Sequence, residues 1–147
     1  MQEICQILVP LDFSMNTIKL VDYASYIAGK FSAKLCFVHV VDTRQAYDLF
    51  LSHPVLTDLQ EKIMAAAEER MASFLRANAD RCKGCTGKVI NGNIVDSLIA
   101  YAKNEKVDLI IIGTHGSKGL EKILLGSVAE RVIKKSPCPT LLYNPYM

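Results

Sequence analysis

The feature of this sequence that most constrains its fold is a regular alternation of short apolar runs with longer amphipathic stretches. The runs are rich in β-branched residues, as strands are, and the stretches between them repeat apolar residues at helical spacing. The expected strands occupy residues 4–9, 34–41, 86–90, 107–112 and 139–143; the expected helices follow Ser14 as a cap, span about 54–79, follow Asn93 as a cap and span 127–135. This β-α-β-α-β-α-β-α-β order predicts an α/β fold, a five-stranded parallel sheet with helices on both faces.

Helical spacing also predicts which side chains face the sheet. The expected set is Ile18, Val21, Ala24, Ala28 and Phe31 in the first helix, Leu56, Leu59, Ile63, Ala67, Met71 and Phe74 in the second, and Ile94, Leu98, Ile99 and Ala102 in the third. The run 34–41 is almost continuously apolar, which is typical of a strand buried on both faces. Residues 42–53 and 114–125 are expected to be loops.

Composition excludes several classes of protein. The chain has 147 residues, half of them apolar and 22% charged, which favours one globular domain over disorder. The formal net charge of +2 argues against a dedicated nucleic-acid binder. No apolar stretch approaches the ~20 residues of a membrane span, and the first residues do not resemble a secretion signal. We therefore expect residues 1–147 to form a single soluble, cytoplasmic domain.

In open parallel sheets, ligands bind beyond the carboxyl ends of the strands, where the strand order reverses. The segments to search are therefore 10–14, 40–43, 91–93 and the residues from Gly113 onward. This rule predicts where a site lies and does not predict its chemistry.

One of these segments has the composition of an anion site. Gly113 ends a buried strand, and Gly126-Ser127 opens a helix whose first amides lack intrahelical partners. Such amides, with the helix dipole, suit a phosphate, and Lys118 or Lys122 is a candidate source of positive charge. The alternative is that the glycines only end a strand and begin a helix. The sequence has neither a Gly-x-x-x-x-Gly-Lys-Ser/Thr P-loop nor a Gly-x-Gly-x-x-Gly motif after its first strand.

The loop and three strands together resemble a known family. Gly113-x2-Gly116-x9-Gly126-Ser127 is similar to the motif of the ATP-binding subclass of the universal stress protein (UspA-like) family. Residues 7–14, 38–42 and 108–113 resemble the family's first, second and fourth strands. The resemblance spans essentially the whole chain and implies an adenine nucleotide alpha hydrolase-like, Rossmann-like fold.

The resemblance also implies a set of nucleotide-binding residues and a quaternary structure. Pro10, Asp12 and the backbone of Val40 would hold adenine and ribose; Ile112, Gly113, His115 and Gly116 would line the ribose and first phosphates; Gly126, Ser127, Val128 and Ala129 would hold the remaining phosphates. The expected ligand is ATP, with Asp12 as a candidate for helping to hold a Mg²⁺ or Mn²⁺ ion. A homodimer would form by antiparallel pairing of the last strand, 139–143, with Pro145 ending the pairing.

The expected function is a nucleotide-binding regulatory module in the stress response. No catalytic residue is predicted, because no carboxylate pair or general base is evident at a spacing that would activate water. Slow ATP hydrolysis, a partner-binding role that changes with ATP, and sensing of AMP or cyclic AMP remain alternatives.

Other candidate residues have simpler interpretations. Cys82-x-x-Cys85 is a possible redox or zinc motif, but a structural zinc site needs four ligands and no second pair exists at suitable spacing. The remaining cysteines, Cys5, Cys36 and Cys138, lie in apolar runs and are expected in the core. His39 is expected to be packed, His53 to lie on the surface, and His115 to be either a ligand contact or an exposed loop residue.

Overall fold

The computed structural model describes residues 2–44, 55–115 and 125–147. They form β1 (Gln6–Pro10), α1 (Thr17–Phe31), β2 (Lys34–Val41), α3 (Val55–Ala77), β3 (Thr86–Asn91), α4 (Ile94–Asn104), β4 (Leu109–Gly113), α5 (Ser127–Lys135) and β5 (Thr140–Tyr143). The strands make one parallel sheet in the order β3-β2-β1-β4-β5. The predicted five-stranded parallel α/β fold is confirmed.

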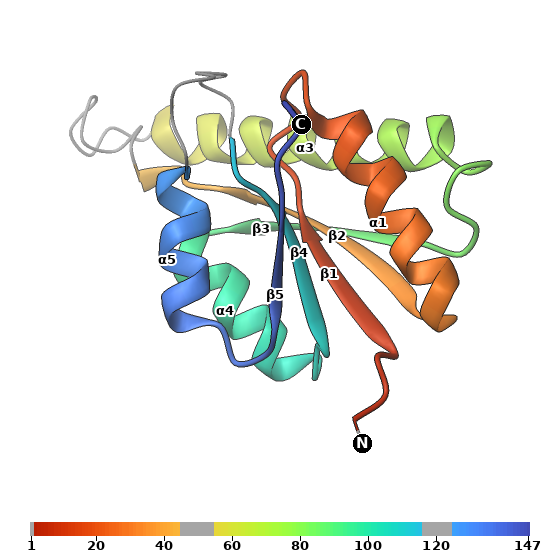
Figure 1. The fold of residues 1–147 in the computed structure, drawn as a ribbon. Coiled ribbons are helices and arrows are strands. Elements are labelled where there is room, and N and C mark those ends of the chain that lie inside the picture. The colour runs from red at the N-terminus through yellow and green to blue at the C-terminus, as the bar shows by residue number, and fades with distance from the viewer. Residues whose placement is uncertain (1, 45–54, 116–124) are drawn as a thin grey trace.

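The sheet is buried on both faces because adjacent strand residues point to opposite sides. Ile7 and Val9 of β1 pack with α1 and α3, whereas Leu8 packs with α4 and α5. Figure 1 shows the two helical layers, α1 with α3 on one side and α4 with α5 on the other. Two apolar cores, one on each face, therefore hold the sheet in place.

The strand order reverses beside β1. The chain runs outward from β1 through β2 to β3, then returns to place β4 on the other side of β1. The loops that leave β1 and β4 consequently diverge to opposite faces, and the carboxyl ends of these strands border a crevice.

The predicted helices exist, but their starts and buried faces differ in part. Helix α1 begins after Asn16, not after Ser14, whose backbone carbonyl accepts a hydrogen bond from Thr17 N at 3.1 Å. Ser14 is not the cap because it belongs to the turn after β1. The side chain of Asn93 does cap α4, accepting from Asp96 N at 3.0 Å.

Several apolar residues expected in the core are exposed. Ile18 lies beside the buried stripe of α1, Phe31 ends that helix, and Ile94 begins α4, with Val95 buried in its place. Cys5 is exposed because it precedes β1, while Cys36 and Cys138 are half-buried. Within the described ranges, no helix is long and apolar enough to cross a membrane.

A carboxylate joins the amino ends of β1 and β4. Asp108 Oδ2 accepts hydrogen bonds from Cys5 N and Gln6 N, both at 2.9 Å. These two bonds stabilise the charged carboxylate and lower the pKa of Asp108 from its ordinary value of 3.8.

We predict that Asp108→Ala lowers the free energy of unfolding by about 1 kcal/mol at pH 7, because two amides lose a charged acceptor. A lowered folded-state pKa stabilises the protein above the ordinary pKa, and this stabilisation is lost as the pH falls through the lowered value. Denaturant unfolding from pH 7 to pH 3 should thus show the two proteins converging. Asp80→Ala, at an exposed aspartate, is the control; an equal loss there, or a gap that widens toward acid, would contradict the assignment.

Candidate functional site at the carboxyl ends of the strands

A cavity of about 920 Å³ lies at the carboxyl ends of the parallel strands, at the reversal between β1 and β4. Ten of the eleven predicted site residues line it: Pro10, Asp12, Val40, Ile112, Gly113, His115, Gly126, Ser127, Val128 and Ala129. Gly116, with Lys118 and Lys122, lies outside the described residues. The fold therefore brings together residues that are more than a hundred positions apart in sequence.

The start of α5 supplies hydrogen-bond donors to this cavity. Gly126 precedes the helix with extended backbone (φ −66°, ψ 154°), and Glu130 N is bonded to Gly126 O at 3.0 Å. The amides of Ser127, Val128 and Ala129 come before the first intrahelical donor. Gly126 N donates to Thr114 O at 2.6 Å, which ties the start of α5 to the exit of β4.

The charges of the described cavity wall are acidic. Asp12 and Glu130 line it, and none of its described residues is lysine or arginine. Within this part of the wall, an anion would be held by the α5 amides and the helix dipole.

The turn after β1 has a strained backbone. Phe13 has a φ of +56°, the left-handed region that aromatic residues rarely occupy. Ser14 N donates to Asp12 Oδ1 at 2.9 Å, closing a local turn around Phe13. This turn places Asp12 on the cavity wall.

Side chains from two other elements hold Phe13 in this conformation. Its ring meets His39 edge-on at 4.8 Å and Phe74 at 5.7 Å between centroids. The Arg70 guanidinium lies 4.7 Å from the ring centroid, and its Nη2 donates to Phe13 O at 3.3 Å. Helix α3 thereby stabilises the turn that carries Asp12.

The histidines have distinct environments. His39 is packed as predicted, with Nδ1 hydrogen-bonded to Leu11 O at 2.7 Å, and it also lines the cavity. His115 is buried, 8% exposed, so the exposed-loop interpretation is wrong. Its Nδ1 is 2.7 Å from Thr114 Oγ1, while its buried Nε2 has no hydrogen-bond partner among the described residues. His53 lies outside the described residues.

The cavity wall also contains residues that the sequence does not indicate. Asn16, Leu98, Tyr143 and Pro145 also line the cavity. Tyr143 ends β5, and its carbonyl accepts from Thr114 N at 2.9 Å. The strand-end rule offered a signal for Tyr143, but nothing local to the sequence marks Asn16 or Pro145.

The rival cysteine motif lies away from this cavity, after α3. Cys85 Sγ donates to Cys82 O at 3.0 Å, and both thiols are free. Burial raises the pKa of the Cys82 thiol to about 12, opposite to the lowered pKa of a reactive thiol. Across the described ranges, no group of three or more His, Cys, Asp or Glu side chains is placed to hold a metal ion.

Comparison with known proteins identifies the family. The universal stress protein family model matches residues 4–144. Universal stress protein MJ0531 of Methanocaldococcus jannaschii is 31% identical over 140 residues, covering 93% of this chain and 80% of that one. The solved structure of MJ0577 from the same organism superposes with a TM-score of 0.81 at 28% identity, covering 97% of each chain. The chain belongs to the universal stress protein family.

Some solved structures of this fold are complexes with nucleotides. A universal stress protein in complex with cAMP has a TM-score of 0.63 at 25% identity, covering 98% of this chain and 99% of that one. An Arabidopsis thaliana family protein with AMP bound has a TM-score of 0.62 at 17% identity, covering 95% and 91%, and shows likeness of fold alone.

The strain at Phe13 leads to a test of stability. At a positive φ, a residue with a Cβ is destabilised relative to glycine, the reverse of the usual order of glycine and alanine. Both Phe13→Gly and Phe13→Ala lose the aromatic contacts, so their difference isolates the backbone. We predict that Phe13→Gly is more stable than Phe13→Ala by about 1 kcal/mol in urea unfolding. Equal stability, or a more stable alanine variant, would show that the turn is not strained.

Proposed function

We propose that this protein is a nucleotide-dependent regulatory module that binds an adenine nucleotide, with ATP preferred. The observation that carries the proposal is the position of the α5 amides: three donors free of intrahelical bonds border a cavity at the reversal of strand order. A phosphate group is the ligand that such a helix start favours. The cAMP complex of a family member supports an adenine nucleotide as the class.

The resemblance to the family suggests a role for each of the lining residues. Pro10, Asp12 and the backbone of Val40 would contact adenine and ribose. Ile112, Gly113, His115 and Gly116 would contact ribose and the first phosphates, and Gly126, Ser127, Val128 and Ala129 the remaining phosphates. All but Gly116 lie on the described wall. The preference for ATP over a monophosphate rests on the similarity of Gly113-x2-Gly116-x9-Gly126-Ser127 to the motif of the family's ATP-binding subclass.

A divalent ion would accompany the phosphates through Asp12. One oxygen of this carboxylate accepts from Ser14 N, and carboxylate oxygen is the ligand that Mg²⁺ prefers. Magnesium bound to a nucleotide is typically held by one or two carboxylates besides the phosphates. We propose Asp12 as that carboxylate.

We also propose that the protein acts in the cytoplasm, because its five cysteines are free and disulfides are rare in that compartment.

The test is a substitution that fills the phosphate position without weakening the helix. Aspartate is a favoured N-cap residue, so Gly126→Asp should preserve α5 while placing a negative charge before its amides. We predict at least about tenfold weaker ATP binding by calorimetry, equivalent to 1.4 kcal/mol. Gly29→Asp is the matched control, because it adds the same charge at an exposed position of α1.

The same titrations separate the alternatives. AMP or cyclic AMP binding more tightly than ATP would replace ATP as the preferred ligand. Phosphate release above the rate of Gly126→Asp would add slow hydrolysis. Unchanged ATP affinity in Gly126→Asp, or no binding of any of these nucleotides by the unmodified protein, would refute the proposed site.

We further propose a homodimer through β5. This strand lies at one edge of the sheet. Pro139 O accepts from Ile110 N and Tyr143 O accepts from Thr114 N, so the backbone groups of every second residue from Pro139 to Tyr143 face β4. Leu142 is out of phase with these residues, and its amide and carbonyl therefore point away from β4. An edge with outward-pointing backbone groups is suited to antiparallel pairing with a second copy.

Leu142→Pro removes one outward amide and leaves the bonds to β4 in place, because proline has no N–H. We predict that it shifts the protein from dimer to monomer in size-exclusion chromatography with light scattering. Leu142→Ala shortens the side chain but keeps the amide, and should remain dimeric. A monomeric unmodified protein, or a dimeric Leu142→Pro variant, would contradict this interface.

A further inference from the structure

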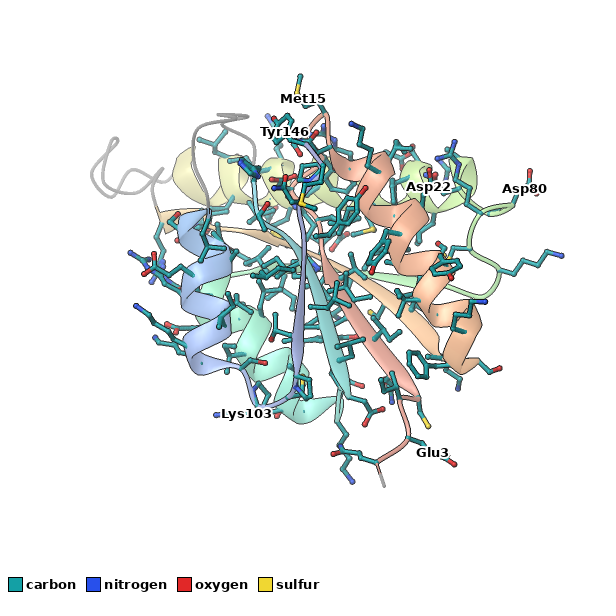
Figure 2. The ribbon with its side chains drawn as sticks, viewed as in Figure 1. Glu3, Met15, Asp22, Asp80, Lys103 and Tyr146 are labelled. Carbon is teal, nitrogen blue, oxygen red and sulfur yellow. The ribbon has the colours of Figure 1, made fainter. Side chains whose placement is uncertain are left out.

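Tyr146, near the end of the chain, contacts two residues of the cavity wall that come from different elements. Its ring meets that of His115 edge-on, with centroids 4.8 Å apart and planes at 86°. Its Oη accepts from Asn16 Nδ2 at 3.4 Å. His115 follows β4 and Asn16 precedes α1, so Tyr146 joins the two sides of the crevice. Figure 2 labels Tyr146 beside Met15, at the end of the molecule where β1 meets α1.

The segment that carries Tyr146 is held in place by hydrogen bonds. Tyr146 N donates to Asn144 Oδ1 at 2.9 Å, forming a turn. Lys19 Nζ donates to Pro145 O at 3.1 Å, which fixes the segment to α1. Pro145 lines the cavity, so this segment lies beside the site and Tyr146 reaches it through His115 and Asn16.

His115 is restrained on two sides. Thr114 Oγ1 shares a hydrogen bond with Nδ1, and the Tyr146 ring packs against the imidazole. Nε2 is the ring nitrogen left without a partner among the described residues, although it is buried. When the Thr114 hydroxyl donates to Nδ1, Nε2 carries the ring proton and can donate to a ligand oxygen.

We propose that Tyr146 is a positioning residue of the nucleotide site, which fixes the His115 imidazole so that Nε2 meets a phosphate oxygen of an adenine nucleotide. The inference rests on the proposed function and deepens it. It predicts that Tyr146 affects phosphate-bearing ligands only through His115. Adenosine, which lacks phosphate, should bind independently of Tyr146.

A double-mutant cycle measures this dependence. Calorimetry with ATP and with adenosine compares the unmodified protein, Tyr146→Leu, His115→Ala and the double variant. Tyr146→Leu is expected to weaken ATP binding about three- to tenfold, the range for an aromatic pair. In the His115→Ala background the same change should alter ATP affinity less than about twofold. Tyr146→Phe should restore ATP binding, because it keeps the ring.

A ligand-free spectroscopic readout separates positioning from general destabilisation. The Tyr146 ring should shift the imidazole proton resonances of His115 by its ring current. The His115 resonances are assigned by their absence from the spectrum of His115→Ala. Their chemical shifts should change in Tyr146→Leu and should be the same in Tyr146→Phe as in the unmodified protein. Met147→Ala is the matched control at the next residue, which is 99% exposed, and should leave affinity and spectrum unchanged.

The outcomes distinguish this inference from the proposed function. If the unmodified protein binds no adenine nucleotide, both fail. If it binds ATP but Tyr146→Leu is without effect, weakens adenosine equally, or weakens ATP equally in both His115 backgrounds, only the positioning role fails. Unmoved His115 resonances in Tyr146→Leu would also overturn it.

Discussion

The burial of β1 and β4 beside each other is the constraint on which the rest of the structure depends. Every residue from Ile7 to Val9 and from Leu109 to Ile112 is buried, so neither face of this strand pair can meet water. Helices must cover both faces, and the chain can provide them only by winding outward from β1 in both directions. The reversal of strand order that results opens a crevice at the strand ends. The position of the candidate site is thus a consequence of covering both faces of the sheet with helices.

The local structures at the crevice contribute different kinds of chemistry. The start of α5 offers amides, and the turn after β1 offers a carboxylate whose position depends on the strained Phe13 backbone and its anchor, Arg70. Strain of this kind persists only where surrounding contacts over-determine it. The packing of α3 against the sheet therefore helps to fix the Asp12 carboxylate, because α3 holds Phe13 in its strained conformation.

Much of the fold could be predicted because its signals are local. The Gly126-Ser127 pair marks the start of α5, and Asn93 marks that of α4, as the structure confirms. Ser14 is not the cap because its amide is bonded to Asp12 in the turn before the helix; α1 begins after Asn16, whose side chain makes no capping hydrogen bond. The positive φ of Phe13 has no sequence signal at all, since glycine or asparagine is the usual residue there.

The residues of the candidate site also fall into two groups, those that the sequence indicates and those that only the tertiary structure brings there. Its glycines and the residues around them follow from the motif, whereas Pro145 and Tyr146 come close to it only because β5 pairs with β4 and brings the end of the chain over the start of α1. Such tertiary placement cannot be read from spacing along the sequence. The buried Nε2 of His115 is likewise a property of packing and not of the glycine motif.

The most direct test of the central claim is mass spectrometry of small molecules released when freshly purified protein is denatured. We predict an adenine nucleotide, ATP above the others, in near-stoichiometric amount from the unmodified protein and little from Gly126→Asp. Equal amounts from both proteins would contradict binding at the start of α5. No adenine nucleotide from the unmodified protein, together with no heat on adding ATP, would mean that the glycines shape the fold without forming a nucleotide site.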